Sequence, residues 1–320
     1  MRLSIVIIIN GDSMAKTKSV RKPTVIISIS FLLLFALWVL ISIGLYKVYF
    51  GGRFESRKSS MRYVQEFEGL ERTRYEFASD KGQTIVGYMY SSGTDQKGII
   101  IFSHGYGAGG HNSYMPCINY LAQNGYYVFA YDATGNDESG GNGIGGVPQG
   151  VIDLNYAISF VEDSGNFPSM PIGLFGHSWG GYSVCNALTY HPEIEAVIEC
   201  SGPCSSSDLV EGGGVKAVGP VVHILMPVIK IYERAKFGEY ATNSGLDGFA
   251  ATDAEIMVIH SDDDDVVPIE YGYDIYYEYY HDDPRFTFIR LTGKGHNSFL
   301  NVDQNRELFE SFIDFYNSNM

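Results

Sequence analysis

Ser178 stands in a short glycine-rich stretch whose pattern could turn its hydroxyl into a nucleophile. The stretch reads Gly176-His177-Ser178-Trp179-Gly180-Gly181, and it follows the apolar run Ile172–Phe175 and begins a helical pattern. A Gly-x-Ser-x-Gly motif between a strand and a helix predicts a sharp, strained turn, because side chains at Gly176 and Gly180 would collide with the neighbouring strand and helix. The turn lifts the hydroxyl next to a helix amino terminus, whose free N–H groups favour developing negative charge. We therefore predict that Ser178 is a nucleophile.

A serine hydroxyl reacts only when a base takes its proton, and the base needs a carboxylate that orients it. With this type of serine turn, the acid and then the histidine follow after later strands. The run Ile256–Ile259 leads into the consecutive aspartates Asp262–Asp265, and the run Phe286–Leu291 leads into His296. We predict that His296 is the general base and that Asp264 orients it. For the aspartates the alternatives are a solvated loop or a Ca²⁺ site, although a calcium-binding loop would need more alternating ligands and a glycine turn. For His296 the alternative is an exposed loop histidine without a catalytic role.

A glycine-rich loop could supply donors for the oxygen of a reacting carbonyl group. The loop His104–Gly110 contains four glycines and directly follows the apolar run Ile99–Phe102. We expect the backbone N–H groups of Tyr106 and Trp179 to form an oxyanion hole, in which each donor contributes about 10²–10³ in rate in acyl-transfer enzymes. The alternative is a loop that is flexible and has no catalytic part.

After residue 62 the chain alternates short apolar runs with longer amphipathic ones. The expected strands are Thr73–Ser79, Thr84–Tyr90, Ile99–Phe102, Tyr127–Ala130, Ile172–Phe175, Ala196–Ile198, Ile256–Ile259 and Phe286–Leu291. The expected helices are Tyr114–Gln123, Gln149–Val161, Trp179–Tyr190, Ile269–Tyr280 and Gln304–Tyr316. Strands that are apolar on both faces and alternate with helices predict an α/β fold, with a mostly parallel sheet flanked by helices and joined by right-handed crossovers.

The connection from Gly202 to Asp253 is 52 residues long, which is longer than any other between the expected strands. Structureless loops of that length are uncommon in compact domains, so we expect it to contain helices. One of them is expected at Val221–Ile231, broken near Pro227. The favoured interpretation is a cap inserted over the binding site at about residues 203–253, and the alternative is a peripheral excursion without a role in binding.

These motifs, in this order and at these strand ends, resemble the α/β-hydrolases, nearest to the serine aminopeptidase and monoglyceride-lipase-like branch and its membrane-anchored relatives. The resemblance covers about residues 70–320 and is carried by His104-Gly105, Tyr131-Asp132 with Gly135 and Ser139-Gly140, Gly176–Gly180, Asp264 with Val267-Pro268, and Gly295-His296. The family usually has histidine-glycine-x-x-aspartate before the valine-proline pair. Ser261 replaces that glycine here, and alignment on Val267-Pro268 selects Asp264 over Asp262, Asp263 and Asp265. The resemblance implies an eight-stranded sheet whose second strand is antiparallel, with the cap after the sixth strand.

The amino-terminal part of the chain has the pattern of a membrane anchor. From Pro23 to Tyr46 there is no charged residue, and at 1.5 Å per residue the run is long enough to cross a hydrocarbon layer of about 30 Å. A cleaved signal peptide would have a shorter core and a small-x-small cleavage site, and a buried helix would show polar residues at a period of 3.6. We expect a short basic segment at 1–23, a transmembrane anchor at 24–46, a basic linker at 47–69 and the hydrolase domain at 70–320.

Charge is distributed unevenly along the chain. Residues 1–62 hold ten Lys and Arg against two acidic residues, a net charge of +8, whereas the other 258 residues hold 12 basic and 35 acidic residues, a net charge of -23. Because so acidic a body repels phosphate polymers, nucleic-acid binding is not expected.

The stretch 141–146 matches Gly-x-Gly-x-x-Gly, but Pro148 follows and no helix begins directly after a strand, so a nucleotide site is not favoured. Cys200 and Cys204 have no second ligand pair, so buried thiols are favoured and no metal or organic cofactor is expected.

The function that these features imply is a membrane-anchored serine hydrolase, which cleaves carboxylic esters, or peptides, through an acyl-serine intermediate. Its partners would be a small-molecule ester, acyl or peptide substrate and, through the N-terminal helix, a membrane. The alternatives are an aminopeptidase or a thioesterase and, in a different class, a non-catalytic membrane-tethered binding module of the same fold. Basic residues flank the apolar run on both sides, so the positive-inside rule does not orient it. The commoner topology for such a short leader places the catalytic domain outside the cytoplasm.

Overall fold

The computed structural model describes residues 21–107 and 109–320. By their contacts these residues form two units, one that ends at Ile41 and one from Ser42 to Met320. Helix α1 (Arg21–Phe50) belongs to both, because its last turns are part of the second unit. Most of the basic segment expected at 1–23 lies outside the described residues.

Two helical stretches among the described residues are long and apolar enough to cross a membrane. One is Thr24–Phe50, with a mean hydropathy of 2.8, and the other is Ser206–Ala241, with a mean hydropathy of 1.5. The second belongs to the folded body, whereas most aliphatic side chains of α1 from Val25 to Ile41 are exposed. A signal sequence near the N-terminus would also meet this criterion of length and hydropathy, so the transmembrane anchor and the division into anchor, linker and domain stay predictions.

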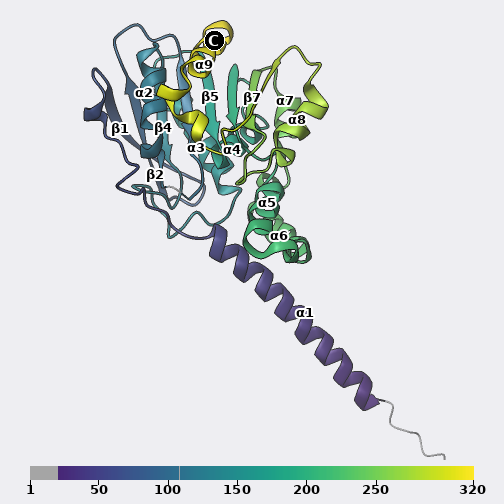
Figure 1. The fold of residues 1–320 in the computed structure, drawn as a ribbon. Helices are drawn as coiled ribbons and strands as arrows, with labels where there is room; N and C mark the ends of the chain where they lie inside the picture. Colours follow the sequence, from purple (N-terminus) through teal and green to yellow (C-terminus); the bar gives the residue numbers. More distant parts are fainter. Residues whose placement is uncertain (1–20, 108) are drawn as a thin grey trace, which may run out of the picture. The chain divides into compact units, whose positions relative to one another are not determined.

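The body is built on one eight-stranded sheet with helices on both faces (Figure 1). The strands are β1 (Glu71–Ala78), β2 (Thr84–Ser91), β3 (Ile99–Ser103), β4 (Tyr127–Asp132), β5 (Ile172–His177), β6 (Ala196–Cys200), β7 (Glu255–Ser261) and β8 (Phe286–Leu291). They lie in the order β1-β2-β4-β3-β5-β6-β7-β8. Strand β2 is antiparallel to both of its neighbours, and the other pairs are parallel. The predicted α/β fold, with an antiparallel second strand, is confirmed.

Side chains that alternate along each buried strand pack against different helices. Helices α2 (Met115–Gln123) and α9 (Arg306–Asn319) share one core with alternate strand residues such as Ile100 and Phe102 of β3. The opposite face is covered by α3 (Gln149–Asp163), α4 (Trp179–Ala187) and α8 (Tyr273–Tyr280). Because the parallel strands all point the same way, the loops that follow them meet at one edge of the sheet. Ligands of open α/β sheets bind at this edge.

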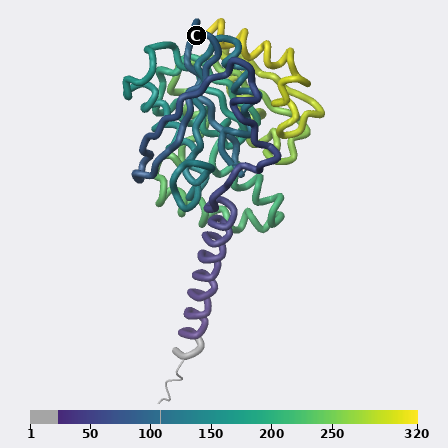
Figure 2. The backbone as a smooth tube through the Cα atoms, turned by 90° about the vertical axis from the view of Figure 1, so that its left-hand side faces the viewer, coloured from purple at the N-terminus to yellow at the C-terminus, as the bar shows by residue number. Residues whose placement is uncertain are grey.

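Between β6 and β7 the chain forms α5 (Ser206–Val218), α6 (Val222–Phe237) and α7 (Gly245–Ala251). Helices α5 and α6 lie together at one end of the body, and the C-terminus lies at the opposite end (Figures 1 and 2). The insertion therefore contains helices, as expected.

The break expected near Pro227 is wrong, because α6 continues through this residue and the chain turns instead at Gly219-Pro220. Pro227 lies in the second turn of α6, where its ring removes a single backbone hydrogen bond. Buried side chains such as Leu225 and Ile229 stabilise the helix by packing.

Candidate active site

Ser178 lies in the turn between β5 and α4, at the carboxyl edge of the sheet. Its backbone angles are φ 58° and ψ −117°, and positive φ is uncommon for a residue with a side chain. A Cβ at Gly176 would overlap the carbonyl group of Gly180, and a Cβ at Gly180 would overlap the carbonyl group of Ser103. The predicted strained turn is therefore confirmed, and the two glycines allow β3, β5 and α4 to approach each other closely.

His296 follows β8 and contacts a carboxylate from the end of the neighbouring strand β7. Its Nδ1 lies 2.7 Å from Oδ2 of Asp264. The other oxygen of this carboxylate accepts hydrogen bonds from the N–H groups of Val266 and Val267, at 2.8 and 2.9 Å. Burial raises the pKa of Asp264, but hydrogen bonds from His260 and His296 outweigh burial and hold the pKa well below its ordinary value. Asp264 is therefore ionised at neutral pH and can accept the N–H of His296.

The other three aspartates of the run each have a different partner: Asp262 accepts the hydroxyl of Thr292 at 2.9 Å, Asp263 accepts the N–H of Gly295 at 3.0 Å, and Asp265 pairs with the ammonium group of Lys216 at 2.9 Å. Because Asp263 holds the residue before His296, it fastens the loop that carries the histidine. Asp264 is the member of the run whose carboxylate reaches His296 itself.

His260, near the end of β7, is a second histidine on the same carboxylate. Its Nε2 lies 2.8 Å from the carbonyl oxygen of Val267 and 3.3 Å from Oδ2 of Asp264. Glu199 of β6 is also buried, and burial raises its pKa to about 8. Burial lowers the pKa of His260, but Asp264 and Glu199 raise it by more, so the pKa lies above its ordinary value. Sequence analysis assigned no role to His260, although a histidine in an apolar strand four residues before an expected acid was a usable signal.

His177 connects the serine turn to the loop of His296. The ring is buried, and burial lowers its pKa to about 3, so it is neutral at neutral pH. Its Nε2 lies 3.0 Å from the carbonyl oxygen of His296, and its Nδ1 lies 2.8 Å from the hydroxyl of Tyr114. Since a carbonyl oxygen can only accept, Nε2 carries the single ring proton and Nδ1 accepts from Tyr114. The same hydroxyl accepts the N–H of Gly105 at 3.0 Å, which joins the glycine-rich loop to the loop of His296.

Tyr106 stands on the loop after β3, and Trp179 directly follows Ser178 at the start of α4. Tyr106 follows β3, which is the neighbour of β5 in the sheet, and Ser103 pairs with Gly176 there. Trp179 is the first residue of α4, where backbone N–H groups have no partner within the helix. The two aromatic rings meet edge to face, with their centroids 6.2 Å apart. One peptide N–H therefore comes from the loop after the neighbouring strand β3, and the other from the first residue of α4, next to Ser178.

These groups lie at one end of a cavity of about 400 Å³, a size typical of small-molecule sites. Its polar end is formed by Gly105, Tyr106, His177, Ser178 and His296. Its apolar walls come from two sources: Leu209, Val210, Val222, Leu225 and Ile229 of α5 and α6, and Leu45, Tyr46, Tyr49 and Phe50 of α1. Ser178 and His296 therefore line one cavity. The contribution of α1 was missed, because an apolar run carries no signal that distinguishes its last turns from the rest.

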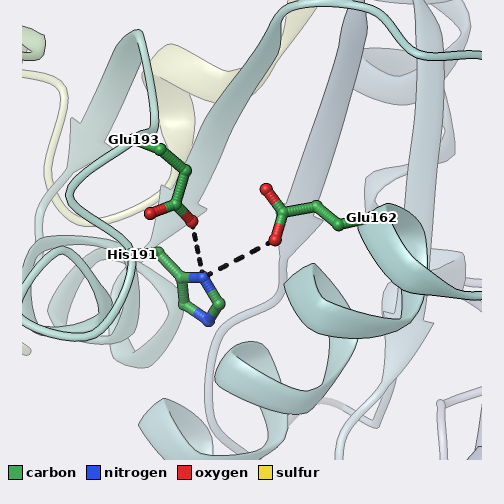
Figure 3. A group of neighbouring side chains, drawn as sticks. All are labelled: Glu162, His191 and Glu193. Carbon is green, nitrogen blue, oxygen red and sulfur yellow. Dashed lines mark hydrogen bonds and ion pairs between the residues drawn. The ribbon is translucent and has the colours of Figure 1, made fainter.

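A further group of potential metal ligands, among the described residues, shares no residue with the cavity lining. It consists of Glu162, His191 and Glu193, whose ligand atoms lie within 4.8 Å of one another. Both carboxylates point toward Nδ1 of the histidine ring (Figure 3), Glu193 at 2.8 Å and Glu162 at 3.9 Å. Nε2 lies 2.6 Å from the side-chain oxygen of Asn155. Each ring nitrogen thus has a protein oxygen as its partner, and the group holds together by these contacts.

Comparison with known proteins supports the fold. Residues 94–246 match the family model described as serine aminopeptidase, S33. Together with the order of the eight strands and the serine turn after β5, this match decides the fold family. The chain has the fold of the α/β-hydrolases. Within them, a monoacylglycerol lipase of Mycolicibacterium smegmatis is 27% identical over 168 residues, which are 50% of this chain and 57% of that protein. This α/β-hydrolase therefore aligns with little more than half the length of the curated relative.

Solved structures share the α/β-hydrolase fold over most of the chain. An esterase of Pyrococcus furiosus, Pf2001, has a TM-score of 0.64 at 19% identity, over 84% of this chain and 98% of the esterase. Carboxyl esterase 2 of the fungus Tuber melanosporum has a TM-score of 0.60 at 15% identity, over 83% and 91% of the two chains. An acylaminoacyl peptidase of Pyrococcus horikoshii has a TM-score of 0.58 at 16% identity, over 79% of this chain and 42% of the peptidase. At these identities the likeness concerns the fold, and the chemistry has to be argued from the site.

Proposed function

We propose that this α/β-hydrolase is a membrane-anchored serine hydrolase, which cleaves carboxylic esters with an apolar acyl chain through an acyl-Ser178 intermediate. The observation that carries the proposal is that Ser178 and His296 line one cavity with apolar walls, and that Nδ1 of this histidine lies 2.7 Å from the carboxylate of Asp264. A strained serine, a histidine and an ionised carboxylate are the groups that acyl transfer to serine requires.

In the first half of the reaction, His296 takes the proton of the Ser178 hydroxyl, whose oxygen forms a bond to the carbonyl carbon of the ester. Negative charge collects on the carbonyl oxygen, where the N–H groups of Tyr106 and Trp179 stabilise it. His296 then gives its proton to the departing alcohol oxygen as the ester C–O bond breaks. The alcohol leaves, and the acyl group remains on Ser178.

In the second half, a water molecule takes the place of the alcohol. His296 removes a proton from the water, and the water oxygen forms a bond to the acyl carbon. The proton passes from His296 to Ser178 as the acyl–serine bond breaks, and the carboxylic acid leaves. In both halves Asp264 accepts the Nδ1–H of His296 and stabilises the positive charge that the ring carries while it holds the transferred proton.

The cavity lining favours esters over peptides with a free amino terminus. An aminopeptidase has to bind a cationic amino group, for which a carboxylate is the natural partner. The described residues that line the cavity include neither Asp nor Glu. The apolar side chains of α5 and α6 favour the alkyl chain of an acyl group, because its burial removes apolar surface from water.

The proposal is tested with a fluorophosphonate probe and a panel of p-nitrophenyl esters. We expect the wild-type chain to be labelled and to hydrolyse esters, and the Ser178→Ala variant to lose both properties. Labelling that persists in Ser178→Ala would refute the assignment of the nucleophile. If the wild-type chain shows neither labelling nor turnover across the panel, the non-catalytic binding module becomes the better interpretation. An acyl-thioester substrate in the same panel separates a thioesterase from an esterase.

We also propose that residues 24–46 anchor the chain in a membrane, with the hydrolase domain outside the cytoplasm. The long apolar helix with exposed aliphatic side chains supports the anchor. The anchored protein should stay in the membrane fraction after high-salt washing, and protease added to intact cells should digest the domain. Recovery of the chain in the soluble fraction would contradict the anchor, and full protection in intact cells with digestion after lysis would contradict the proposed side.

A further inference from the structure

The end of α1 and the chain that follows it are built into the region of the candidate active site. We call residues 45–56 the junction segment. Sequence analysis placed these residues at the end of an anchor and in a linker. In the structure they belong to the same unit as the hydrolase body, form part of the cavity wall and contact the glycine-rich loop of Tyr106.

We propose that the junction segment is part of the active site, in which Phe50 determines which acyl chains bind and Tyr49 positions the oxyanion loop through Tyr106. This inference rests on the proposed function and deepens it, because it names the residues that recognise the acyl chain.

Phe50 stands between the oxyanion loop and the cap helix α5. Its ring centroid lies 5.5 Å from that of Tyr106, and a Cβ on Gly213 of α5 would lie 3.9 Å from the tip of the ring. Leu45 and Tyr49 line the same cavity. A long acyl chain on Ser178 that lies along this apolar wall would bury more surface against the ring of Phe50 than an acetyl group does.

Buried hydrogen bonds fasten the first half of the junction segment to the cap. The hydroxyl of Tyr46 donates to the carboxylate of Glu233 on α6. The hydroxyl of Ser206 on α5 contacts both oxygens of the same carboxylate, at 2.9 and 2.8 Å. The N–H of Val147 donates to the hydroxyl oxygen of Tyr46 at 3.0 Å. Since all these partners are buried, the wall formed by α1 has a defined position relative to α5 and α6.

A second set of bonds fastens the other half of the segment to the loop after β4. The N–H of Phe54 donates to the carbonyl oxygen of Gly135 at 2.9 Å. The N–H and the hydroxyl of Ser56 both donate to the carboxylate of Asp137, at 2.5 Å each. This carboxylate also accepts the N–H of Gly110, the last residue of the glycine-rich loop, at 2.9 Å. Asp137 thus ties the end of that loop to the junction segment.

Tyr106, whose peptide N–H is a proposed oxyanion donor, is held by its side chain. Its hydroxyl donates to the carbonyl oxygen of Tyr49. Its ring packs against Phe50 and against Phe54, whose centroid lies 4.9 Å away. An oxyanion donor works because it is aimed before the charge develops. The junction segment therefore positions this donor, and loss of the Tyr49 contact should slow turnover for every ester alike.

The test of the acyl wall uses the full chain in detergent micelles and p-nitrophenyl acetate, butyrate, octanoate and laurate. For Phe50→Ala we expect kcat/KM to fall about tenfold for octanoate and laurate, and to change less than about twofold for acetate. Leu40→Ala is the matched control, because Leu40 lies on the same helix outside the junction segment, is 69% exposed and does not line the cavity. This control should follow the wild type across the series. Phe50→Leu, which keeps an apolar but smaller side chain, should show a smaller loss, about threefold for octanoate and laurate.

The test of the positioning role uses Tyr106→Phe, which removes the bond to Tyr49 and keeps the ring. We expect kcat to fall about tenfold for all four esters, with KM changed less than twofold. A dependence of the loss on acyl length, or a wild-type kcat, would overturn this role.

For Phe50, a wild-type ratio of laurate to acetate activity in the Ala variant overturns the proposal. Circular dichroism shows whether Phe50→Ala folds. If it does not fold, the Phe50→Leu variant is used in its place. A ratio of laurate to acetate activity that is unchanged from wild type in Phe50→Leu then overturns the proposal, and a reduced ratio supports it. Failure of the proposed function is a different result: the wild-type chain itself would show neither fluorophosphonate labelling nor ester cleavage, and both proposals would fall.

Discussion

The ring of His177 holds the backbone of His296: its Nε2 lies 3.0 Å from the carbonyl oxygen of that residue. The residue that precedes the candidate nucleophile in sequence is thus bonded to the loop of the candidate base, which is 119 residues away. On its other side the ring accepts from Tyr114, which in turn accepts from the oxyanion loop at Gly105. Nucleophile turn, base loop and oxyanion loop are therefore joined by one short chain of hydrogen bonds.

Replacement of Tyr114 by phenylalanine should loosen this chain. The N–H of Gly105 and the Nδ1 of His177 both lose a buried partner, so we expect the free energy of unfolding to fall by about 1–3 kcal/mol and kcat to fall about tenfold. Urea unfolding and p-nitrophenyl butyrate kinetics measure the two effects. Tyr120→Phe is the control, since Tyr120 lies on α2 nearby and contacts Phe309 with its ring. Equal kcat in the two variants would contradict a role for the Tyr114 hydroxyl.

The pKa of His177 should make stability depend on pH on the acid side. The unfolded chain takes up a proton on this histidine below about pH 6.5, whereas burial lowers the pKa in the folded protein to about 3. Between these values the unfolded state binds more protons, so the free energy of unfolding falls as the pH falls, by up to about 1.4 kcal/mol per unit. Urea unfolding from pH 7 to pH 4 should show a smaller slope for His177→Gln than for the wild type. Identical slopes would argue against a neutral, buried His177.

The four consecutive aspartates should differ sharply in their effect on catalysis. Asp264→Asn removes the charge that stabilises the protonated ring of His296 and the acceptor that fixes its tautomer, so we expect kcat to fall about 10⁴-fold, as in other serine enzymes of this mechanism. Asp265→Asn is the matched control, because this exposed residue pairs with Lys216 at the surface, and its kcat should stay within about twofold of wild type. A loss of less than tenfold in Asp264→Asn would remove Asp264 from the proposed mechanism.

Glu199 should make stability depend on pH in the opposite direction. The unfolded carboxyl group loses its proton near pH 4.3, whereas burial raises the pKa in the folded protein to about 8. Between these values the folded state binds more protons, so the free energy of unfolding falls as the pH rises. Glu199→Gln keeps an oxygen to accept the N–H of Gly202 and cannot titrate, so this variant should be more stable than wild type at pH 8. Parallel curves for the two proteins from pH 5 to pH 8 would contradict the raised pKa.

Most of the sheet could be predicted because its signal is local. Strand β8 begins and ends at the expected residues, Phe286 and Leu291, since a run of apolar and β-branched side chains favours an extended backbone wherever it lies. The order of the strands is different in kind, because periodicity does not say which strands pair. The antiparallel β2 was expected from the resemblance to the α/β-hydrolases. The helix break at Pro227 was wrong, because the packing of α6 outweighs the loss of one hydrogen bond.

By itself the sequence determined the serine turn and the order of the reactive residue types. The steric reason for the turn is contained within Gly176–Gly180 and the strands beside it, so a five-residue motif is enough to specify it. Only the tertiary structure decided which aspartate reaches His296, and that His260 shares its carboxylate. It also decided that Tyr46 binds Glu233, 187 residues further along the chain, and so makes the end of an apolar helix a wall of the cavity. Such contacts depend on how distant elements pack, and no local pattern of residues encodes them.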